Sequence, residues 1–114
     1  MYSGIPESDW KKIRDLKSVL LDRLCQRILQ EVAVQATEPS RTPHERYLAI
    51  YKLIHERDRD IAEIFDGLSR SKAMMCILNA RHHSLLTDEE FGRFSEDTRA
   101  EVDRILEFRN REDD

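Results

Sequence analysis

The sequence is poor in the residues that make turns, since its 114 residues include only three glycines and three prolines. Sandwiches and barrels need a turn after each short strand, so this shortage argues against an all-β fold. Apolar runs long enough to span a membrane are missing, and the opening residues lack the apolar core of a secretion signal. We therefore expect a cytoplasmic protein without a membrane partner.

Motifs of enzymes and metal sites are also missing. The two cysteines, Cys25 and Cys76, lie in apolar helical patterns without the spacing of a metal site, so we expect buried, reduced thiols. The sequence has no Gly-rich phosphate loop, no GxSxG turn and no HExxH helix. The neighbours His82 and His83 would point about 100° apart on a helix and cannot hold one metal ion by themselves. These absences favour a protein without catalytic residues, metal or cofactor.

Helix-forming residues make up much of the chain. Hydrophobic residues account for 39% and charged residues for 37%, a balance that favours amphipathic helices with charged outer faces. Apolar residues recur at spacings of three and four over residues 9–36 and again over residues 43–66. We predict an all-α helical bundle of four to five helices, in which these two segments form long antiparallel helices.

Local signals predict where the long helices begin and end. Ser8 is placed to cap the first one. Thr42 and Glu45 form a capping box for the second, with Pro43 at its first position. Gly67 is a natural end for that helix.

Shorter helices are expected in the C-terminal part. The apolar run AMMCIL could be a buried strand by its period, but Ala, Met and Leu favour a helix. Thr87 and Glu90 form a second capping box, and Ser95 is placed to cap a final helix. The predicted organisation is a flexible start over residues 1–8, a single helical domain over 9–108 and a disordered acidic tail over 109–114.

One carboxylate interrupts the apolar face of the second long helix. Projected at 100° per residue, Asp58 falls between Tyr51 and Ile61 on that face. Burying an unpaired charge is costly, so we expect Asp58 to meet an arginine, a tyrosine, a ligand or an oligomer interface. His55 lies one turn back, and Glu31 interrupts the first helix in a similar way. A ligand-binding pocket of Asp58, His55, Tyr51 and Glu31 is one hypothesis, and a structural ion pair is the favoured alternative.

Charge is unevenly distributed along the chain. Residues 1–86 carry 14 basic and 12 acidic side chains, a net charge of +2, whereas residues 87–114 carry 5 and 11, a net charge of −6. One stretch without acidic residues forms a basic patch, whose members are Arg70, Lys72, Arg81, His82 and His83. Three full charges are few for binding a nucleic-acid backbone, so a solvated rim around a buried helix is the favoured interpretation.

The first long helix would span about 40 Å, which is long for a domain of this size. Its apolar stripe also widens toward the C-terminal half. With the dense charge and the missing catalytic motifs, this favours a non-enzymatic protein that acts through helix faces, as a homodimer, an adaptor or a regulator. A small-ligand or metal-binding bundle with a polar pocket at Asp58 and His55 is the first alternative. A nucleic-acid-associated regulator that uses the basic patch is the second.

Overall fold

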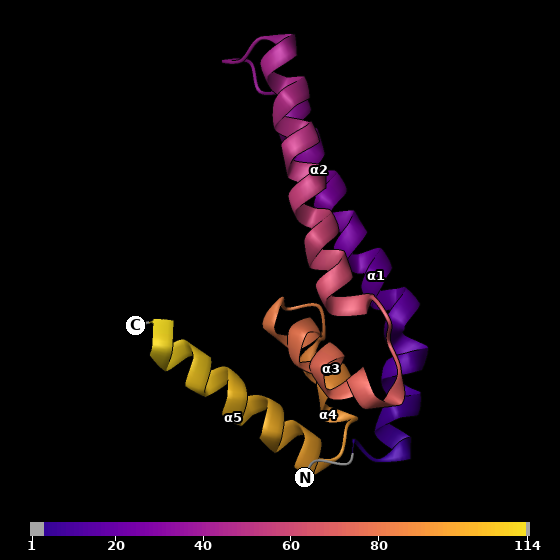
Figure 1. The fold of residues 1–114 in the computed structure, drawn as a ribbon. Helices are drawn as coiled ribbons and strands as arrows, with labels where there is room; N and C mark the ends of the chain where they lie inside the picture. Colours follow the sequence, from indigo (N-terminus) through magenta and orange to yellow (C-terminus); the bar gives the residue numbers. More distant parts are fainter. Residues whose placement is uncertain (1–3, 114) are drawn as a thin grey trace.

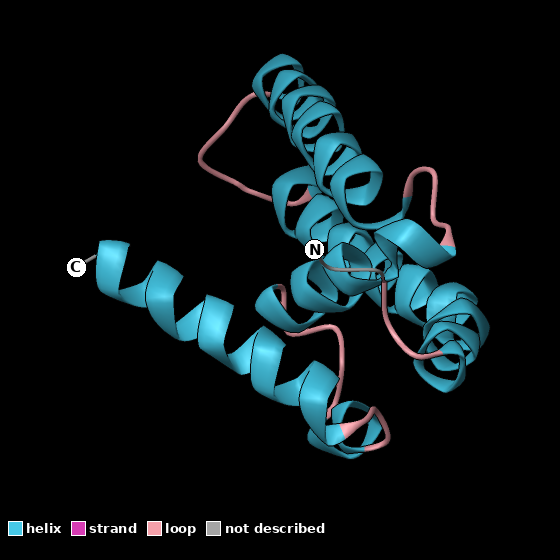
Figure 2. Ribbon diagram, turned by 60° about the horizontal axis from the view of Figure 1, so that its bottom comes forward, coloured by secondary structure: helices cyan, strands magenta, loops and turns pink. Residues whose placement is uncertain are grey.

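The computed structural model describes residues 4–113, which form five α-helices and one 3-10 turn (Figure 1). The bounds are α1 Glu7–Ala36, α2 Pro43–Phe65, the 3-10 turn Arg70–Lys72, α3 Ala73–His82, α4 Asp88–Gly92 and α5 Glu96–Asp113. Helices joined by loops make up this whole range, and it contains no strand (Figure 2). The predicted all-α fold is confirmed, and the run AMMCIL lies in a helix.

Local capping sets the ends of α2. Thr42 Oγ1 accepts a hydrogen bond from the Glu45 N–H at 3.1 Å, and the Glu45 carboxylate accepts one from the Thr42 N–H at 2.8 Å. Pro43 occupies the first turn, where a missing N–H leaves no hydrogen bond unmade. Gly67, just beyond the helix, has a φ of +65°, in the left-handed region that favours glycine. The predicted boundaries of this helix are therefore confirmed.

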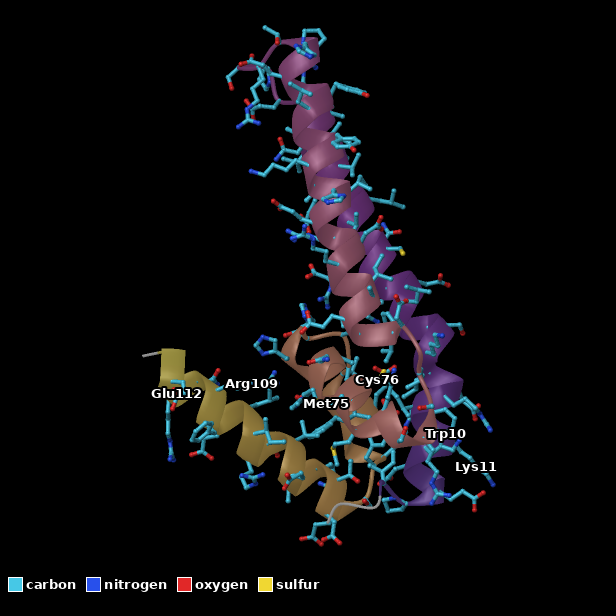
Figure 3. The ribbon with its side chains drawn as sticks, viewed as in Figure 1. Trp10, Lys11, Met75, Cys76, Arg109 and Glu112 are labelled. Atoms are coloured by element: carbon cyan, nitrogen blue, oxygen red, sulfur yellow. The ribbon has the colours of Figure 1, made fainter. Side chains whose placement is uncertain are left out.

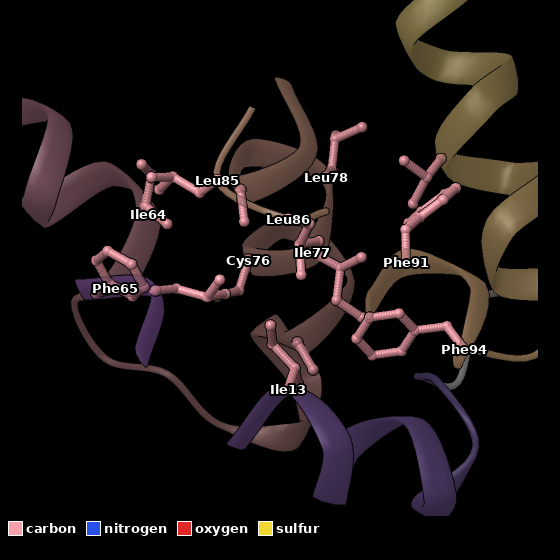
Figure 4. Close-up of a cluster of buried hydrophobic side chains, with 14 of the residues drawn as sticks. Ile13, Ile64, Phe65, Cys76, Ile77, Leu78, Leu85, Leu86, Phe91 and Phe94 are labelled. Atoms are coloured by element: carbon pink, nitrogen blue, oxygen red, sulfur yellow. The ribbon is translucent and has the colours of Figure 1, made fainter. Parts of the chain in front are cut away.

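The core is built around α3, of whose ten residues six are buried. This helix contacts α1, α2 and α5. Figure 4 shows Cys76 and Ile77 of α3 among Ile13 of α1, Phe65 of α2 and Phe94 from the loop before α5. The buried hydrophobic residues are Ile5, Ile13, Leu20, Leu24, Ile28, Ile64, Phe65, Ala73, Cys76, Ile77, Leu78, Ala80, Leu85, Leu86, Phe91, Phe94 and Val102.

A helical hairpin projects from this core (Figure 1). We call residues 29–63 the arm: they form the end of α1, the loop and most of α2, and none of their side chains is buried. The other described residues form the head, which contains all the buried core residues. The radius of gyration is 16.8 Å, with extents of 53 × 33 × 25 Å, whereas a compact domain of this length would have about 13 Å. The arm explains this elongation.

The N-terminal end differs from the sequence prediction. Within residues 1–8, predicted to be flexible, Ile5 is buried in the core and α1 has already begun. The N-cap of α1 is Pro6, so Ser8, the predicted cap, lies inside the helix. Burial of Ile5 anchors the chain ahead of the helix, which a polar sequence context did not indicate. Residues 1–3 lie outside the described part.

The C-terminal end differs as well. α5 continues to Asp113, so most of the predicted disordered tail, residues 109–114, is helical. An ion pair between Glu107 and Arg111 at 2.6 Å supports the last turns, because residues four apart lie on the same side of a helix. Residue 114 itself lies outside the described part.

Candidate functional site

The two helices of the arm contact each other through one face of α2. Arg57 of α2 binds both carboxylate oxygens of Glu31 of α1, with nitrogen–oxygen distances of 3.0 to 3.3 Å, and Asp60 at 3.4 Å. Nearer the loop, Arg46 donates to the carbonyl oxygen of Ala36 at 2.9 Å. Later residues of α1 thus meet earlier residues of α2, as in a hairpin. The contacts leave the other faces of α2 open.

One of these open faces carries aromatic and apolar side chains. We call the outer stripe five residues that follow each other along it at spacings of three and four: His44, Tyr47, Tyr51, Ile54 and Asp58. All five are exposed, Tyr47 by 65%, Tyr51 by 66% and Ile54 by 40%. This spacing is the heptad pattern of helices that pack lengthwise against other helices.

The heptad pattern of the outer stripe continues into the head. Its next members on α2 are Ile61, at the inner end of the arm, and Phe65 of the head. Phe65 is buried in the core, and Ile61 is partly buried against it. The same side of α2 is therefore covered near the head and uncovered along the outer part of the arm. Within the described chain, no further helix lies beside the outer part of the arm (Figures 1 and 3).

Exposed apolar side chains are concentrated in the arm. The most exposed large hydrophobic residues of the described chain are Val19, Leu29, Val34, Tyr47, Leu48, Tyr51, Ile54, Met75 and Phe108. Six of these nine belong to the arm. Such a concentration is typical of a surface that another protein covers, whereas single exposed hydrophobic residues are ordinary.

The predicted burial of Asp58 is wrong, because Asp58 is exposed. The projection correctly placed it on the face of Tyr51, but this part of the face lies beyond the end of the core. The rings of Tyr51 and His55 lie nearly parallel on the same side of α2, with centroids 6.5 Å apart. Glu31 does not join them, since it binds Arg57 between the two helices. Three of the four predicted ligand-binding residues thus share an open helix face.

A shallow hollow follows the arm between its two helices. Its lining is of mixed charge and consists of Gln35, Arg41, Glu45, Leu48, Ala49, Lys52, Leu53 and Glu56. It includes none of the four residues of the predicted ligand pocket. In residues 4–113, no three His, Cys, Asp or Glu side chains gather as they would around a metal ion. No helix in that range has the length and apolar character needed to cross a membrane.

The predicted basic patch is divided between the two ends of α3. Arg70 and Lys72 lie in the 3-10 turn before it. Arg70 donates to the carbonyl oxygen of Ile5 at 3.3 Å, so part of its hydrogen-bonding capacity holds the N-terminal segment.

The other members lie at the end of α3, about 15 Å along its axis from the first two. Arg81 binds Asp88 at 2.8 Å and lies 4.4 Å above the ring of Phe91. The rings of His82 and His83 meet edge to face, with centroids 5.5 Å apart. The structure does not bring the five residues together on one surface.

Sequence reasoning missed a buried carboxylate at the start of α1. Asp9 is 0% exposed. It accepts hydrogen bonds from the Ser95 N–H at 2.9 Å, the Ser95 hydroxyl at 2.6 Å and the Thr98 hydroxyl at 2.7 Å. Burial alone would raise the pKa of Asp9, but these hydrogen bonds outweigh it and lower the pKa. Ser95 also caps α5, as predicted, so Asp9 fastens the start of α5 to α1.

Two arginines of α1, one turn apart, hold the turn after α3. Arg27 donates to two carbonyl oxygens of residues 83–85, at 2.5 and 2.7 Å, and Arg23 donates to the third. Arg23 also binds Glu90 of α4 at 2.8 Å. The hydrogen bond from Arg23 lowers the pKa of Glu90 to about 2. These contacts, like those of Asp9, have a structural role.

The two cysteines are free thiols in different surroundings. Cys76 is buried in the core, which raises its pKa to about 11, and Cys25 is half-buried. A protonated thiol is a poor nucleophile, so Cys76 packs as a small apolar side chain.

Comparison with known proteins adds no relative. The chain matches no protein family model, no curated protein and no solved structure. The outer stripe is therefore the candidate functional site on physical grounds alone.

Proposed function

We propose that this chain is a non-enzymatic, helical protein-interaction protein that forms a homodimer through the outer stripe. The exposure of Tyr47, Tyr51 and Ile54 on one heptad face carries the proposal. Tyrosine suits such a role, because its ring contributes a large contact area at a small cost in conformational entropy. The protein acts in the cytoplasm, where its two thiols remain reduced.

The surface area supports this function. A folded monomer of this mass is expected to expose about 6,500 Å², and this chain exposes 7756 Å². The excess exceeds the roughly 800 Å² that each partner contributes to an interface of standard size. Covering the arm on one side would bring the exposed area into the ordinary range.

The alternatives receive less support. A ligand pocket at Asp58 and His55 would need walls, and both residues lie on an open helix face. Binding to nucleic acid would need a continuous basic surface, and the charge of Arg81 is already paired with Asp88.

Sedimentation velocity tests the proposal. Between about 1 µM and about 1 mM, the range of Kd for interfaces of modest strength, the protein should change from monomer to dimer. Replacing Tyr47 and Tyr51 together by serine should leave a monomer with unchanged helical circular dichroism. Phe108→Ser removes an equally exposed aromatic ring from α5 and is the matched control, which should still dimerise. A wild-type monomer over the whole range would refute the proposal.

A further inference from the structure

The hairpin of the arm has two open sides, and the contact between α1 and α2 separates them (Figure 1). Glu31 of α1 and Arg57 of α2 mark the line of contact through their ion pair, and Arg46 marks it nearer the loop. Both helices are right-handed, and the helices of a hairpin run in opposite directions. The residue directly after a contact residue therefore points to the same side of the hairpin from either helix, and the residue directly before it points to the other side.

The hollow and the outer stripe lie on opposite sides of the hairpin. Glu45 and Glu56, directly before the two contact arginines of α2, both line the hollow. Tyr47 and Asp58, directly after these arginines, belong to the outer stripe. The outer stripe therefore points away from the hollow.

Apolar residues of α1 lie on the same side as the outer stripe. Val32 directly follows the contact residue Glu31, and Leu29 and Ala36 lie three positions before and four positions after Val32, on the same helix face. Leu29 is 61% exposed, Ala36 is exposed and Val32 is half-buried. We call these three residues the α1 stripe. Together the two stripes make an apolar surface that is two helices wide.

The two sides of the arm differ in charge. The hollow is lined by four charged residues, Arg41, Glu45, Lys52 and Glu56. The α1 stripe carries no charge, and neither does the outer stripe between its two ends. Of the six exposed large hydrophobic residues of the arm, four lie on the uncharged side, namely Leu29, Tyr47, Tyr51 and Ile54. A side without charge can meet a copy of itself without placing like charges together.

The outer stripe alone offers too little surface for a stable dimer. Tyr47 and Tyr51 are 65% and 66% exposed, so from a full area of roughly 200 Å² each they contribute about 260 Å² together. This is about a third of the roughly 800 Å² that each partner contributes to an interface of standard size. The α1 stripe lies beside the outer stripe and extends the same surface. Two such surfaces packed face to face would make a four-helix bundle, whose core takes apolar side chains from every helix.

We propose that the arms of two copies of this chain pack face to face as a four-helix bundle, in which the α1 stripe is buried together with the outer stripe. This inference rests on the proposed homodimer and adds that α1 forms part of its interface. In a two-fold contact each copy presents the same surface, so Leu29 and Ala36 enter the contact from both chains.

Two matched substitutions on α1 test the proposal. Leu29→Arg places a charge inside the proposed contact and should weaken the dimer by about tenfold or more in Kd, measured by sedimentation velocity. Val34→Arg is the control, because Val34 is 64% exposed and directly precedes Gln35, which lines the hollow. This variant should dimerise like the wild type. Both positions are exposed in the monomer, so the helical circular dichroism of both variants should be unchanged.

A thiol reporter tests the same contact without adding charge. Ala36→Cys and Val34→Cys would be made separately in a background with Cys25→Ser, in which the remaining Cys76 is buried. As the protein concentration rises above Kd, modification of position 36 by a thiol reagent should slow in proportion to the monomer that remains. Modification of position 34 should keep its rate, because this side of the arm stays open.

The outcomes separate this inference from the proposed function. A dimer whose Kd is unchanged by Leu29→Arg, or in which position 36 reacts as fast as in the monomer, would overturn the four-helix bundle and leave the homodimer standing. Equal weakening by Leu29→Arg and Val34→Arg would also overturn it, since the contact would then not be confined to the uncharged side. A wild-type protein that stays monomeric would overturn both proposals.

Discussion

Replacement of Asp9 is the sharpest test of how the head is held together. Asp9→Ala removes a fully buried carboxylate and leaves three donors of Ser95 and Thr98 without their acceptor. Thr98 is only 2% exposed, so water does not replace the lost partner of its hydroxyl easily. An orphaned buried donor costs about 1 to 3 kcal/mol, and the Ser95 donors, which are half-buried, cost less. We expect a total loss of about 3 kcal/mol in the free energy of unfolding.

Urea unfolding followed by circular dichroism measures this loss. With a slope of about 1.5 to 2.5 kcal/mol per molar urea for a domain of this size, the midpoint should fall by between about 1 and 2 M. All variants should be compared at one protein concentration, because association adds to apparent stability. Asp15→Ala, on the exposed side of the same helix, should change the free energy of unfolding by less than about 0.5 kcal/mol.

A double-mutant cycle checks the cause. Thr98→Val removes one of the donors, so in combination with Asp9→Ala it should cost less than the sum of the two single changes. Additive effects, or a loss below about 1 kcal/mol for Asp9→Ala, would show that the hydrogen bonds to Asp9 are not what fastens α5 to α1.

Two further predictions follow from ionisation. The pKa of Glu90 is lowered from 4.5 to about 2, so its ion pair with Arg23 stabilises the fold above pH 4.5, and this stabilisation should be lost as the pH falls from about 5 toward 2. Glu90→Gln should be less stable at pH 7 and flatten the pH dependence of the urea midpoint, and an unchanged slope would contradict this. Burial raises the pKa of Cys76 to about 11, so a thiol reagent at pH 8 should modify the half-buried Cys25 first and Cys76 only after denaturant is added. Equal rates for the two thiols would show that the core opens easily.

Much of the fold could be predicted because its signals are local. Thr42, Pro43 and Glu45 mark the start of α2 within four residues, and Thr87 with Glu90 marks the start of α4 in the same way. A capping box depends only on neighbouring residues, so sequence is sufficient to recognise it. Ser8 has no matching Glu or Gln three residues later, and its prediction as a cap is wrong.

The candidate site was harder to predict, because burial depends on the whole fold. Asp58 lies on a heptad face of α2. The spacing of apolar residues shows which residues share a helix face, but it does not show whether another part of the chain covers that face. Asp9 was the carboxylate that the same rule should have identified, since it precedes Ile13, Leu16 and Leu20 on the apolar face of α1 at spacings of four, three and four. A carboxylate in the first turn of a helix is ordinarily explained by its favourable interaction with the helix dipole. The hydrogen-bond partners of Asp9 lie 86 and 89 residues away in the sequence, and no local pattern predicts them.

The absence of buried side chains between residues 29 and 63 also has a consequence for motion. Local opening of a segment costs little free energy where few apolar contacts must break. Amide hydrogens of the arm should therefore exchange with solvent through local fraying, whereas those of α3 should exchange only through global unfolding. The arm and the head are thus separate units of local stability within one chain. If the arm also forms the dimer contact, its exchange rates should fall as the protein concentration rises. Association would then order the part of the molecule that is least stable in the monomer.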